Sequence, residues 1–318
     1  MKKLLALCAL AAVAISGSAH AQEVTLRASS AFGLGTAFAK PFEEFVAHVN
    51  ETGKGVVQIN LIGGPEAVPP FEVGNAVSTG VVDMANVTAA FYTNLLPVGD
   101  ALKLARTTAQ EQRENGCYAI VDELHQSKMN VKYLARTGDQ IPFHLYLTKP
   151  IDGPDLSGLT IRTTPVYQAM FGALGANLVR TAPGEVYTSL ERGAIDGYGW
   201  PTQGILDLGW HERTKYRVDP GFYNVDVNVI VNLDKWNGLT DEQRAFLDEA
   251  ANWLEAKNAE ANAVNDSEKQ KQADAGIEVI EFTGENRDKW LTAAYEEGWK
   301  AVTEVDGESA GKLRPCFE

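Results

Sequence analysis

The stretch VTLRASSAFGLGTAFAKPFEEFVAHV at residues 24–49 decides the fold class. It opens with a strand-like run at 24–28, which a turn rich in Ser and Gly follows at 29–36. The remainder is predicted to be a helix that ends at Gly53, because apolar residues recur there at helical spacing: Phe38, Phe42, Phe45, Val46 and Val49. A strand followed by an amphipathic helix is typical of an α/β protein.

The same alternation continues along the chain. A second strand is expected at 56–62, a short helix at 71–78 and a third strand at 81–87, and this β-α-β-α-β order implies parallel strands with helical crossovers. Later segments are assigned by the same patterns: extended runs at 134–148, 159–163 and 224–232, and helices near 111–126, at 166–174 and from 185 to 193. The sequence therefore predicts an α/β fold throughout.

The C-terminal quarter contains a long predicted helix. Thr240 and Gln243 form a capping box that opens it, and nothing breaks it before Gly276. A helix of this length exceeds one small domain, so we expect it to run along two domains. A strand at 277–282 and an amphipathic helix at 286–302 complete the predicted elements.

The N-terminus has the pattern of a signal peptide. Two lysines precede an apolar run at 4–15, and residues 18–21 end in the small-x-small pattern that signal peptidase cleaves. We predict a signal peptide at 1–21, cleavage after Ala21 and export to the periplasm. The apolar run is too short for a stable membrane anchor. A lipid anchor on Cys8 is rejected, because Leu7 stands where a small residue is needed.

The net charge limits the kinds of ligand. With 42 acidic and 28 basic residues the formal charge is -14, which argues against nucleic acid as a partner. An anionic ligand would need a buried positive charge of its own in the pocket, so each buried arginine becomes a candidate.

Cysteine and histidine residues leave two questions open. After cleavage the chain keeps Cys117 and Cys316, which either form a disulfide in an oxidising compartment or are two unrelated thiols. The histidines are scattered singly, without HExxH, CxxC or another metal-binding spacing. We expect no metal and no cofactor.

The segment 156–201 carries a specific resemblance. It reads LSGLTIRTTP at 156–165, LGAN at 174–177 and EVYTSLERGAIDG at 185–197, and YGWP follows at 198–201. In these motifs, and in TGVVD at 79–83, the chain resembles the solute-binding proteins of tripartite ATP-independent periplasmic (TRAP) transporters of the C4-dicarboxylate type. The resemblance implies a periplasmic-binding-protein-like fold, in which two α/β domains enclose a ligand cleft. We predict domain I at 22–140 with 226–266 and domain II at 141–225 with 267–318.

Two ligand-binding residues follow from this resemblance. Arg162 sits in the strand-like run 159–163, which breaks at Pro165, near an edge where open α/β sheets place ligands. It falls on the arginine with which the family clamps the substrate carboxylate. From the residues alone, an ion pair with an acid on a neighbouring strand is the alternative. Trp200 matches a pocket position of the family, whereas the other interpretation is a core aromatic residue.

Departures from the family pattern shape the predicted ligand. Phe143 stands where many members carry a second arginine. Thr88 and Phe91 lie near positions that hold polar and charged sugar contacts in some members, and Phe32 falls in the first pocket loop. Such a cavity suits a compact monocarboxylate with an apolar or aromatic body. Some relatives bind a metal through a glutamate just before the tryptophan, and here that residue is Gly199.

Three classes of function remain at this stage. The first is capture of a small organic acid for the membrane subunits of a TRAP transporter, and the second is a sensory binding protein of the same fold. The third is a periplasmic hydrolase or isomerase that uses Glu185, Asp196 or His144. No catalytic motif supports the third class, so we expect a protein that is not an enzyme.

Overall fold

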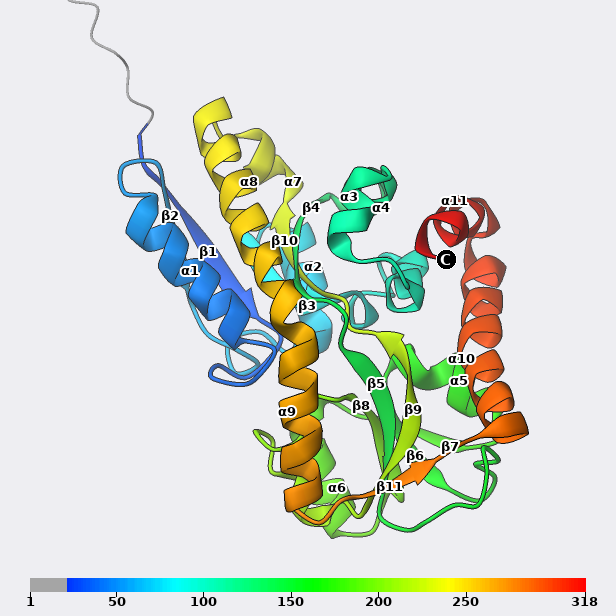
Figure 1. Ribbon diagram of the computed structural model, residues 1–318. Helices are drawn as coiled ribbons and strands as arrows, with labels where there is room; N and C mark the ends of the chain where they lie inside the picture. Colours follow the sequence, from blue (N-terminus) through cyan, green and yellow to red (C-terminus); the bar gives the residue numbers. More distant parts are fainter. Residues whose placement is uncertain (1–21) are drawn as a thin grey trace, which may run out of the picture.

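The computed structural model describes residues 22–318, which form two mixed β-sheets and the helices around them (Figure 1). The predicted signal peptide at 1–21 lies outside the described residues. The two-sheet α/β architecture confirms the predicted fold class.

The first sheet has the strand order β2-β1-β3-β10-β4. Its strands are β1 (Val24–Ser30), β2 (Val57–Leu61), β3 (Met84–Thr88), β4 (Val131–Gly138) and β10 (Val227–Asn232). β1 pairs in parallel with β2 and β3, and α1 (Lys40–Thr52) and α2 (Val73–Ser78) are the crossovers between them. This confirms the predicted β-α-β-α-β order. β10 runs antiparallel to both β3 and β4.

The second sheet has the order β11-β9-β5-β8-β6-β7. Its strands are β5 (Pro142–Leu147), β6 (Thr160–Thr163), β7 (Asn177–Arg180), β8 (Gly197–Pro201), β9 (Tyr216–Asn224) and β11 (Glu278–Glu281). β6 is parallel to β7 and β8, whereas β5 is antiparallel to β8 and β9. Two helices follow strands of its parallel part: α5 (Pro165–Ala173) after β6 and α6 (Val186–Glu191) after β7.

The chain passes between the two sheets at two short connections, one from β4 to β5 and one from β9 to β10. Both connections fall inside runs that the sequence predicts to be continuously extended, 134–148 and 224–232. In the first connection Gln140 has a φ of 56°, so the strand cannot continue through it. Each predicted run is therefore divided between two sheets, and the prediction of single extended segments is wrong there.

The long helix runs beside both sheets, as expected (Figure 1). It consists of α8 (Asp241–Ala256) and α9 (Ala261–Asp274), joined by a 3₁₀ turn at Lys257–Glu260 that the sequence does not reveal. The capping box of Thr240 and Gln243 is present. α8 packs on the first sheet through buried residues such as Leu247 and Leu254, whereas α9 reaches the second sheet, where Gln272 donates a hydrogen bond to the carbonyl of Thr202.

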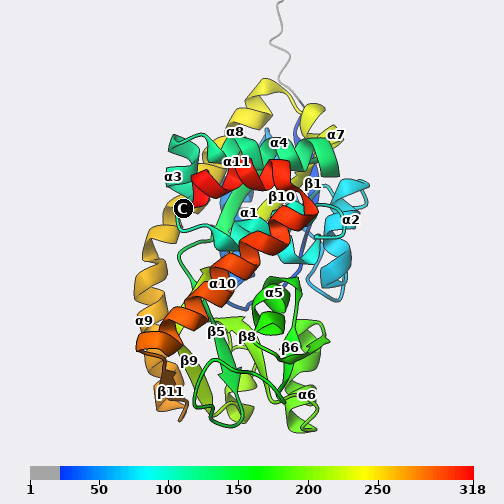
Figure 2. The ribbon, with the colours of Figure 1, turned by 90° about the vertical axis from the view of Figure 1, so that its right-hand side faces the viewer.

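The C-terminal segment returns to the first half of the molecule. α10 (Gly284–Val305) passes diagonally across one side, and α11 (Gly307–Phe317) packs against α4 (Cys117–Met129) (Figure 2). Cys316 in α11 forms a disulfide with Cys117 at the start of α4, with 5.7 Å between the two Cα atoms. The helix expected near 111–126 is in fact two, α3 (Ala109–Glu114) and α4, because Gly116 between them has a φ of 86°.

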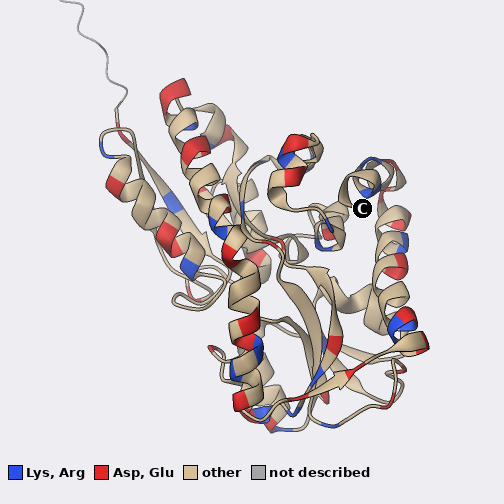
Figure 3. Cartoon of the chain, in the orientation of Figure 1, with Lys and Arg blue, Asp and Glu red and all other residues tan. Residues whose placement is uncertain are grey.

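The remaining short elements connect these parts. They are α7 (Leu233–Asn237) and the 3₁₀ turns Pro70–Glu72, Ala89–Phe91, Pro97–Leu104, Pro183–Glu185 and Trp210–Arg213. Figure 3 shows acidic and basic residues interspersed along the outer helices, whereas the strands of the second sheet are mostly uncharged. Within residues 22–318, no helix combines the length and the apolar character needed to cross a bilayer.

Candidate functional site

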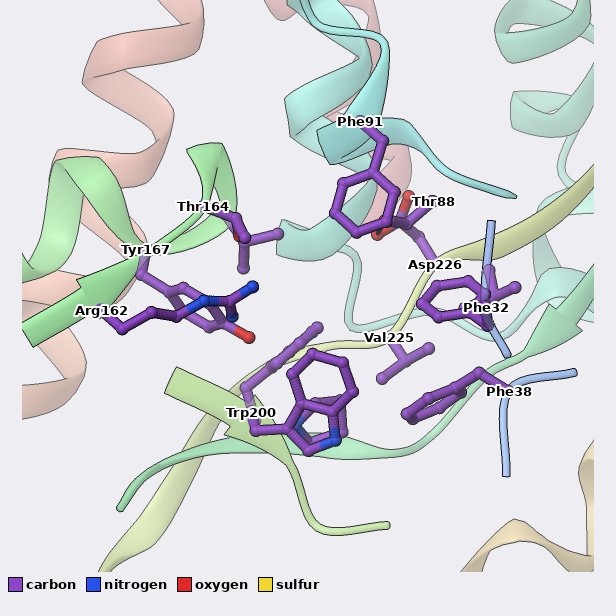
Figure 4. Close-up of a pocket in the computed structure, with 14 residues that line it drawn as sticks. Phe32, Phe38, Thr88, Phe91, Arg162, Thr164, Tyr167, Trp200, Val225 and Asp226 are labelled. Carbon is purple, nitrogen blue, oxygen red and sulfur yellow. Dashed lines mark hydrogen bonds between the residues drawn. The ribbon is translucent and has the colours of Figure 1, made fainter. Parts of the chain in front are cut away.

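A small cavity lies between the two sheets, where the chain crosses from one to the other. Both halves of the molecule line it, together with the β9–β10 connection (Figure 4). Its lining residues are Phe32, Phe38, Thr88, Phe91, Phe143, Arg162, Thr164, Val166, Tyr167, Trp200, Pro201, Val225, Asp226 and Val227. All six ligand-binding candidates from the sequence, which are Phe32, Thr88, Phe91, Phe143, Arg162 and Trp200, are in this set.

The first half supplies Phe32 and Phe38 from the loop after β1, Thr88 from the end of β3 and Phe91 from the following 3₁₀ turn. The second half supplies Phe143 on β5, Arg162 on β6 and Trp200 on β8. β6 and β8 are parallel neighbours, so Arg162 and Trp200 reach the same edge of the second sheet. The carboxyl ends of parallel strands are where open α/β sheets place ligands.

Arg162 is the main polar group of the cavity. Its side chain is fully buried, and its Nε and Nη2 donate hydrogen bonds of 3.1 and 2.8 Å to the carbonyl oxygen of Thr181. Nη1 is buried without a hydrogen-bond partner in the described part of the chain. Burial lowers the pKa of this guanidinium to about 10, which still leaves it charged at neutral pH.

The other two buried arginines of the described chain differ from Arg162, because each has a carboxylate partner. Arg136 lies 3.7 Å from a carboxylate oxygen of Asp139, and Arg217 donates to Asp219 at 2.9 Å. Among residues 22–318, no Asp or Glu carboxylate comes within 4.0 Å of the Arg162 guanidinium. The alternative interpretation of Arg162 as a structural ion-pair residue therefore has no partner in the described structure. A buried charge with a free donor fits a ligand that brings the missing negative charge.

Two further features surround the guanidinium. Tyr167 on α5 is buried beside it, and Figure 4 shows the tyrosine hydroxyl next to the guanidinium group. Burial raises the pKa of Tyr167, so the hydroxyl keeps its proton and can donate. The first turn of α5 also faces the cavity, through Thr164 and Val166. The positive end of a helix dipole favours an anion there.

The opposite end of the cavity holds a carboxylate that the sequence analysis missed. Asp226 in the β9–β10 connection accepts hydrogen bonds from the Thr88 hydroxyl at 3.1 Å and from the Ala89 backbone N–H at 2.9 Å. Burial raises its pKa to about 6, although these bonds and the charge of Arg136 favour the ionised form. The only sequence signal is a single acid between Val225 and Val227 in an apolar run.

Aromatic side chains form most of the remaining wall. The Phe32 ring lies 5.6 Å from the Phe38 ring and 5.8 Å from the Phe91 ring, measured between centroids. Trp200 lies below the Arg162 guanidinium, whose Cζ is 5.8 Å from the centre of the indole. Phe143 packs edge-on against Tyr167. We refer to Phe32, Phe38 and Trp200 together as the aromatic wall.

The cavity is tight. The space open to the centre of a water molecule is about 40 Å³. Since one buried water needs about 10–15 Å³ by this measure, the cavity has room for a compact ligand group.

Side-chain packing explains why residue 199 is a glycine. A Cβ atom at this position would lie 2.6 Å from ring atoms of Tyr167, far closer than van der Waals contact. A glutamate here, which the resemblance implies for some relatives, would have to displace that ring. Among residues 22–318, no three His, Cys, Asp or Glu side chains lie close enough together to hold a metal ion.

The residues considered for catalysis do not come together. His144 is buried on β5, with one ring nitrogen 2.9 Å from Asp219 and the other 3.0 Å from the Thr202 hydroxyl. Glu185 precedes α6, and Asp196 accepts a hydrogen bond from the Thr160 backbone before β8. None of His144, Glu185 and Asp196 lines the cavity. The hydrolase or isomerase hypothesis therefore has no assembled site among these residues.

Two α/β halves that enclose a cavity at their border form the architecture of the periplasmic-binding-protein class. The model of the DctP family, bacterial extracellular solute-binding protein, family 7, matches residues 29–304, and the chain belongs to this family. It is a TRAP transporter solute-binding protein, as the sequence resemblance indicated, and this family is not one of enzymes.

One curated relative and two solved structures illustrate the similarity. The monocarboxylate 2-oxoacid-binding periplasmic protein of Nostoc sp. is 28% identical over 243 residues, which cover 69% of this chain and 65% of that protein. A TRAP transporter solute-binding protein of Bordetella bronchiseptica, with copurified calcium and picolinate, has a TM-score of 0.80, 23% identity and coverage of 93% and 91% of the two chains. The Bordetella pertussis receptor DctP6, which binds pyroglutamic acid, has a TM-score of 0.82, 17% identity and coverage of 92% and 99%. The two structures establish the fold.

Proposed function

We propose that this protein captures a small organic acid in the cavity between its two halves and delivers it to the membrane subunits of a TRAP transporter. The observation that carries the proposal is the free Nη1 of Arg162, a buried cationic donor without a carboxylate partner among the described residues. A ligand carboxylate bound there would supply the hydrogen-bond acceptor and the negative charge that the protein itself does not provide.

The Tyr167 hydroxyl and the first turn of α5 support the same assignment, because both favour an anion beside Arg162. The ligand's other end would face Phe32, Phe91 and Trp200, so we infer an acid with an apolar or flat body. The small size of the cavity favours a compact monocarboxylate over a polyhydroxylated acid. The names of the relatives support a carboxylate in general, since 2-oxoacids, picolinate, pyroglutamate, D-glucuronate and L-galactonate all carry one.

Asp226 sets a condition on the ligand. Its carboxylate lines the cavity at the end that Thr88 forms. A second carboxylate on the ligand would come close to this acid and be repelled when Asp226 is ionised. We therefore propose that the protein selects monocarboxylates against dicarboxylates of similar size.

We further propose that the two sheets belong to two domains that close on the ligand. Domain I comprises 22–140 with 226–266, and domain II comprises 141–225 with 267–318, except that α11 (Gly307–Phe317) packs on α4 of domain I. α11 would move with domain I, because the disulfide of Cys316 ties it to α4. The closed form would be the one that the membrane subunits recognise. The signal peptide at 1–21, cleaved after Ala21, belongs to the same proposal, and N-terminal sequencing of the exported protein tests it.

The experiment that tests the function is a thermal-shift screen against organic acids. A ligand that binds only the native state raises the unfolding midpoint by mass action. Monocarboxylates such as pyruvate, picolinate and pyroglutamate should raise it, and succinate and glucuronate should do so less. A screen in which only sugars or amines stabilise the protein would contradict the proposal. A sensory role would involve the same ligand, and pull-down with the membrane subunits distinguishes transport from sensing.

A further inference from the structure

We propose that the ligand site has a second, apolar compartment on the other side of the aromatic wall, which receives the chain of a longer monocarboxylate. This inference rests on the proposed function, because it concerns the end of the ligand that points away from Arg162. We call this compartment the side chamber. It is larger than the Arg162 cavity, with about 260 Å³ open to the centre of a water molecule against about 40 Å³.

The side chamber shares its wall with the cavity. Phe32, Phe38 and Trp200 line both spaces, so a single layer of aromatic side chains separates them. Beyond the wall the side chamber is bounded by Pro70 from the first half and by Ala182 and Leu208 from the second. Both halves of the molecule therefore enclose it, as they enclose the cavity, and closure of the two halves would bury its contents.

The lining of the side chamber is mostly apolar. Water in such a space finds few hydrogen-bond partners, so an apolar chain that displaces it gains free energy. To enter from the cavity, an acyl chain would have to turn the ring of Phe38 or Phe32 aside. The carboxylate would stay at Arg162, and the chain would lie along the indole of Trp200.

A buried donor of the aromatic wall shows which side of the wall faces the side chamber. Nε1 of Trp200 is buried without a hydrogen-bond partner in the described residues, and Trp200 itself is 5% exposed. This nitrogen is 3.3 Å from the position that a Cβ atom on Gly204 would take. Gly204 lines the side chamber and is not among the residues that line the cavity. The free N–H therefore lies on the chamber side of the wall, next to Gly204.

The test is a calorimetric titration with unbranched 2-oxo acids, from pyruvate to 2-oxoheptanoate. The wild-type protein should bind successive members more tightly, by about fourfold for each methylene that enters the side chamber. The variant Ala182→Phe fills the side chamber from the second half. In this variant, the ratio of the affinity for 2-oxohexanoate to the affinity for pyruvate should be at least tenfold smaller than in the wild type. Leu208→Trp fills the chamber from another loop and provides a second test if the first variant does not fold.

The matched control is Ala194→Phe, which places the same ring on an exposed position outside both spaces. It should keep the wild-type preference for long acids. Two results would contradict the side chamber but not the proposed function, provided that pyruvate binds. One is a wild-type affinity that falls steadily with chain length. The other is an unchanged preference for long acids in folded Ala182→Phe and Leu208→Trp. If the wild type binds no member of the series, the proposed function fails for this ligand class and the side chamber fails with it.

Discussion

The ring of Phe38, from the first half of the molecule, packs edge-on against the indole of Trp200, from the second half, with 6.0 Å between the ring centroids. This contact joins the two halves at the border of the cavity. Its partners come from a loop after β1 and from β8, so it forms only when the halves are together. On the proposed function, the aromatic wall would contact the ligand and would also hold the two halves in the closed arrangement.

Replacement of Trp200 by alanine should weaken ligand binding. The variant loses the indole face beside Arg162 and the contact with Phe38, and we expect the dissociation constant to rise by about 10- to 100-fold, or roughly 1.4–2.8 kcal/mol. Isothermal titration with the acid that stabilises the wild type best measures the change. Trp253→Ala is the control, because that indole stacks on His48 away from the cavity. Equal affinity in Trp200→Ala and Trp253→Ala would show that the wall does not contact the ligand.

Gly199→Ala should destabilise the protein by about 1–3 kcal/mol, because the new methyl group would overlap the Tyr167 ring. Chemical denaturation followed by circular dichroism measures this loss. Gly311→Ala in α11 is the control: nothing lies within 4 Å of its Cβ position, and alanine favours a helix. The control should be neutral or stabilising. A Gly199→Ala protein as stable as the wild type would mean that the ring of Tyr167 is free to move.

The Cys117–Cys316 disulfide should be detectable in the exported protein. Mass spectrometry of the unreduced, alkylated protein should find no label on either cysteine. The double variant Cys117→Ser/Cys316→Ser should lose about 2–5 kcal/mol of unfolding free energy, because the bridge joins two residues that are 199 positions apart in the unfolded chain. Two label adducts on the unreduced protein would contradict the bridge.

Asp219 should make stability depend on acid pH. Burial opposes its ionisation, but hydrogen bonds from His144 and Arg217 outweigh burial and hold the pKa of this carboxyl well below its usual range. A lowered pKa in the folded state stabilises the protein above the unfolded pKa, near about 4, and this contribution is lost as the pH falls further. We expect the unfolding free energy to drop below pH 4 in the wild type and less steeply in Asp219→Asn.

The control for this pH dependence is Asp241→Asn, whose carboxylate is fully exposed in the structure. It should retain the wild-type slope between pH 4 and pH 2, measured by urea denaturation at each pH. If the unfolding free energies of the wild type and Asp219→Asn fall in parallel with pH, the contacts of Asp219 with His144 and Arg217 do not contribute to stability.

The sequence predicted most of the fold because periodicity and turn residues report local structure. The β-α-β-α-β order and the capping box of Thr240 were predicted correctly. The periodicity of 134–148 gave no sign of the split between two sheets, because both strands are apolar and the break depends on the backbone of a single residue, Gln140. Only the predicted domain boundary after residue 140 pointed to it. Strand β9 was missed before residue 224, because Pro220 and Gly221 lie within it and are normally depleted in strands.

The candidate site was predictable where a motif carried it. Arg162 and Trp200 come from the segment that resembles the family, and the structure brings them to one cavity. Asp226 and Tyr167 were not predicted. The sequence around each of them indicates only a residue packed in the interior. The folded structure is needed to place the side chain at the cavity. The need for a glycine at position 199 likewise depends on the ring of Tyr167, which is distant in sequence.

Arg162 carries the central claim, that the cavity binds a carboxylate through a buried guanidinium. The direct measurement is calorimetric titration of Arg162→Ala and Arg162→Lys with the acid that stabilises the wild type best, beside circular dichroism to confirm folding. Arg287→Ala, an exposed arginine on α10, is the control. Alanine leaves the bound carboxylate without a counter-charge, at a cost of about 2–5 kcal/mol, so its dissociation constant should rise by about 30-fold to more than 1,000-fold. Lysine keeps the charge without the planar pair of donors and should fall between alanine and the wild type. Near-wild-type affinity in a folded Arg162→Ala protein would contradict the claim.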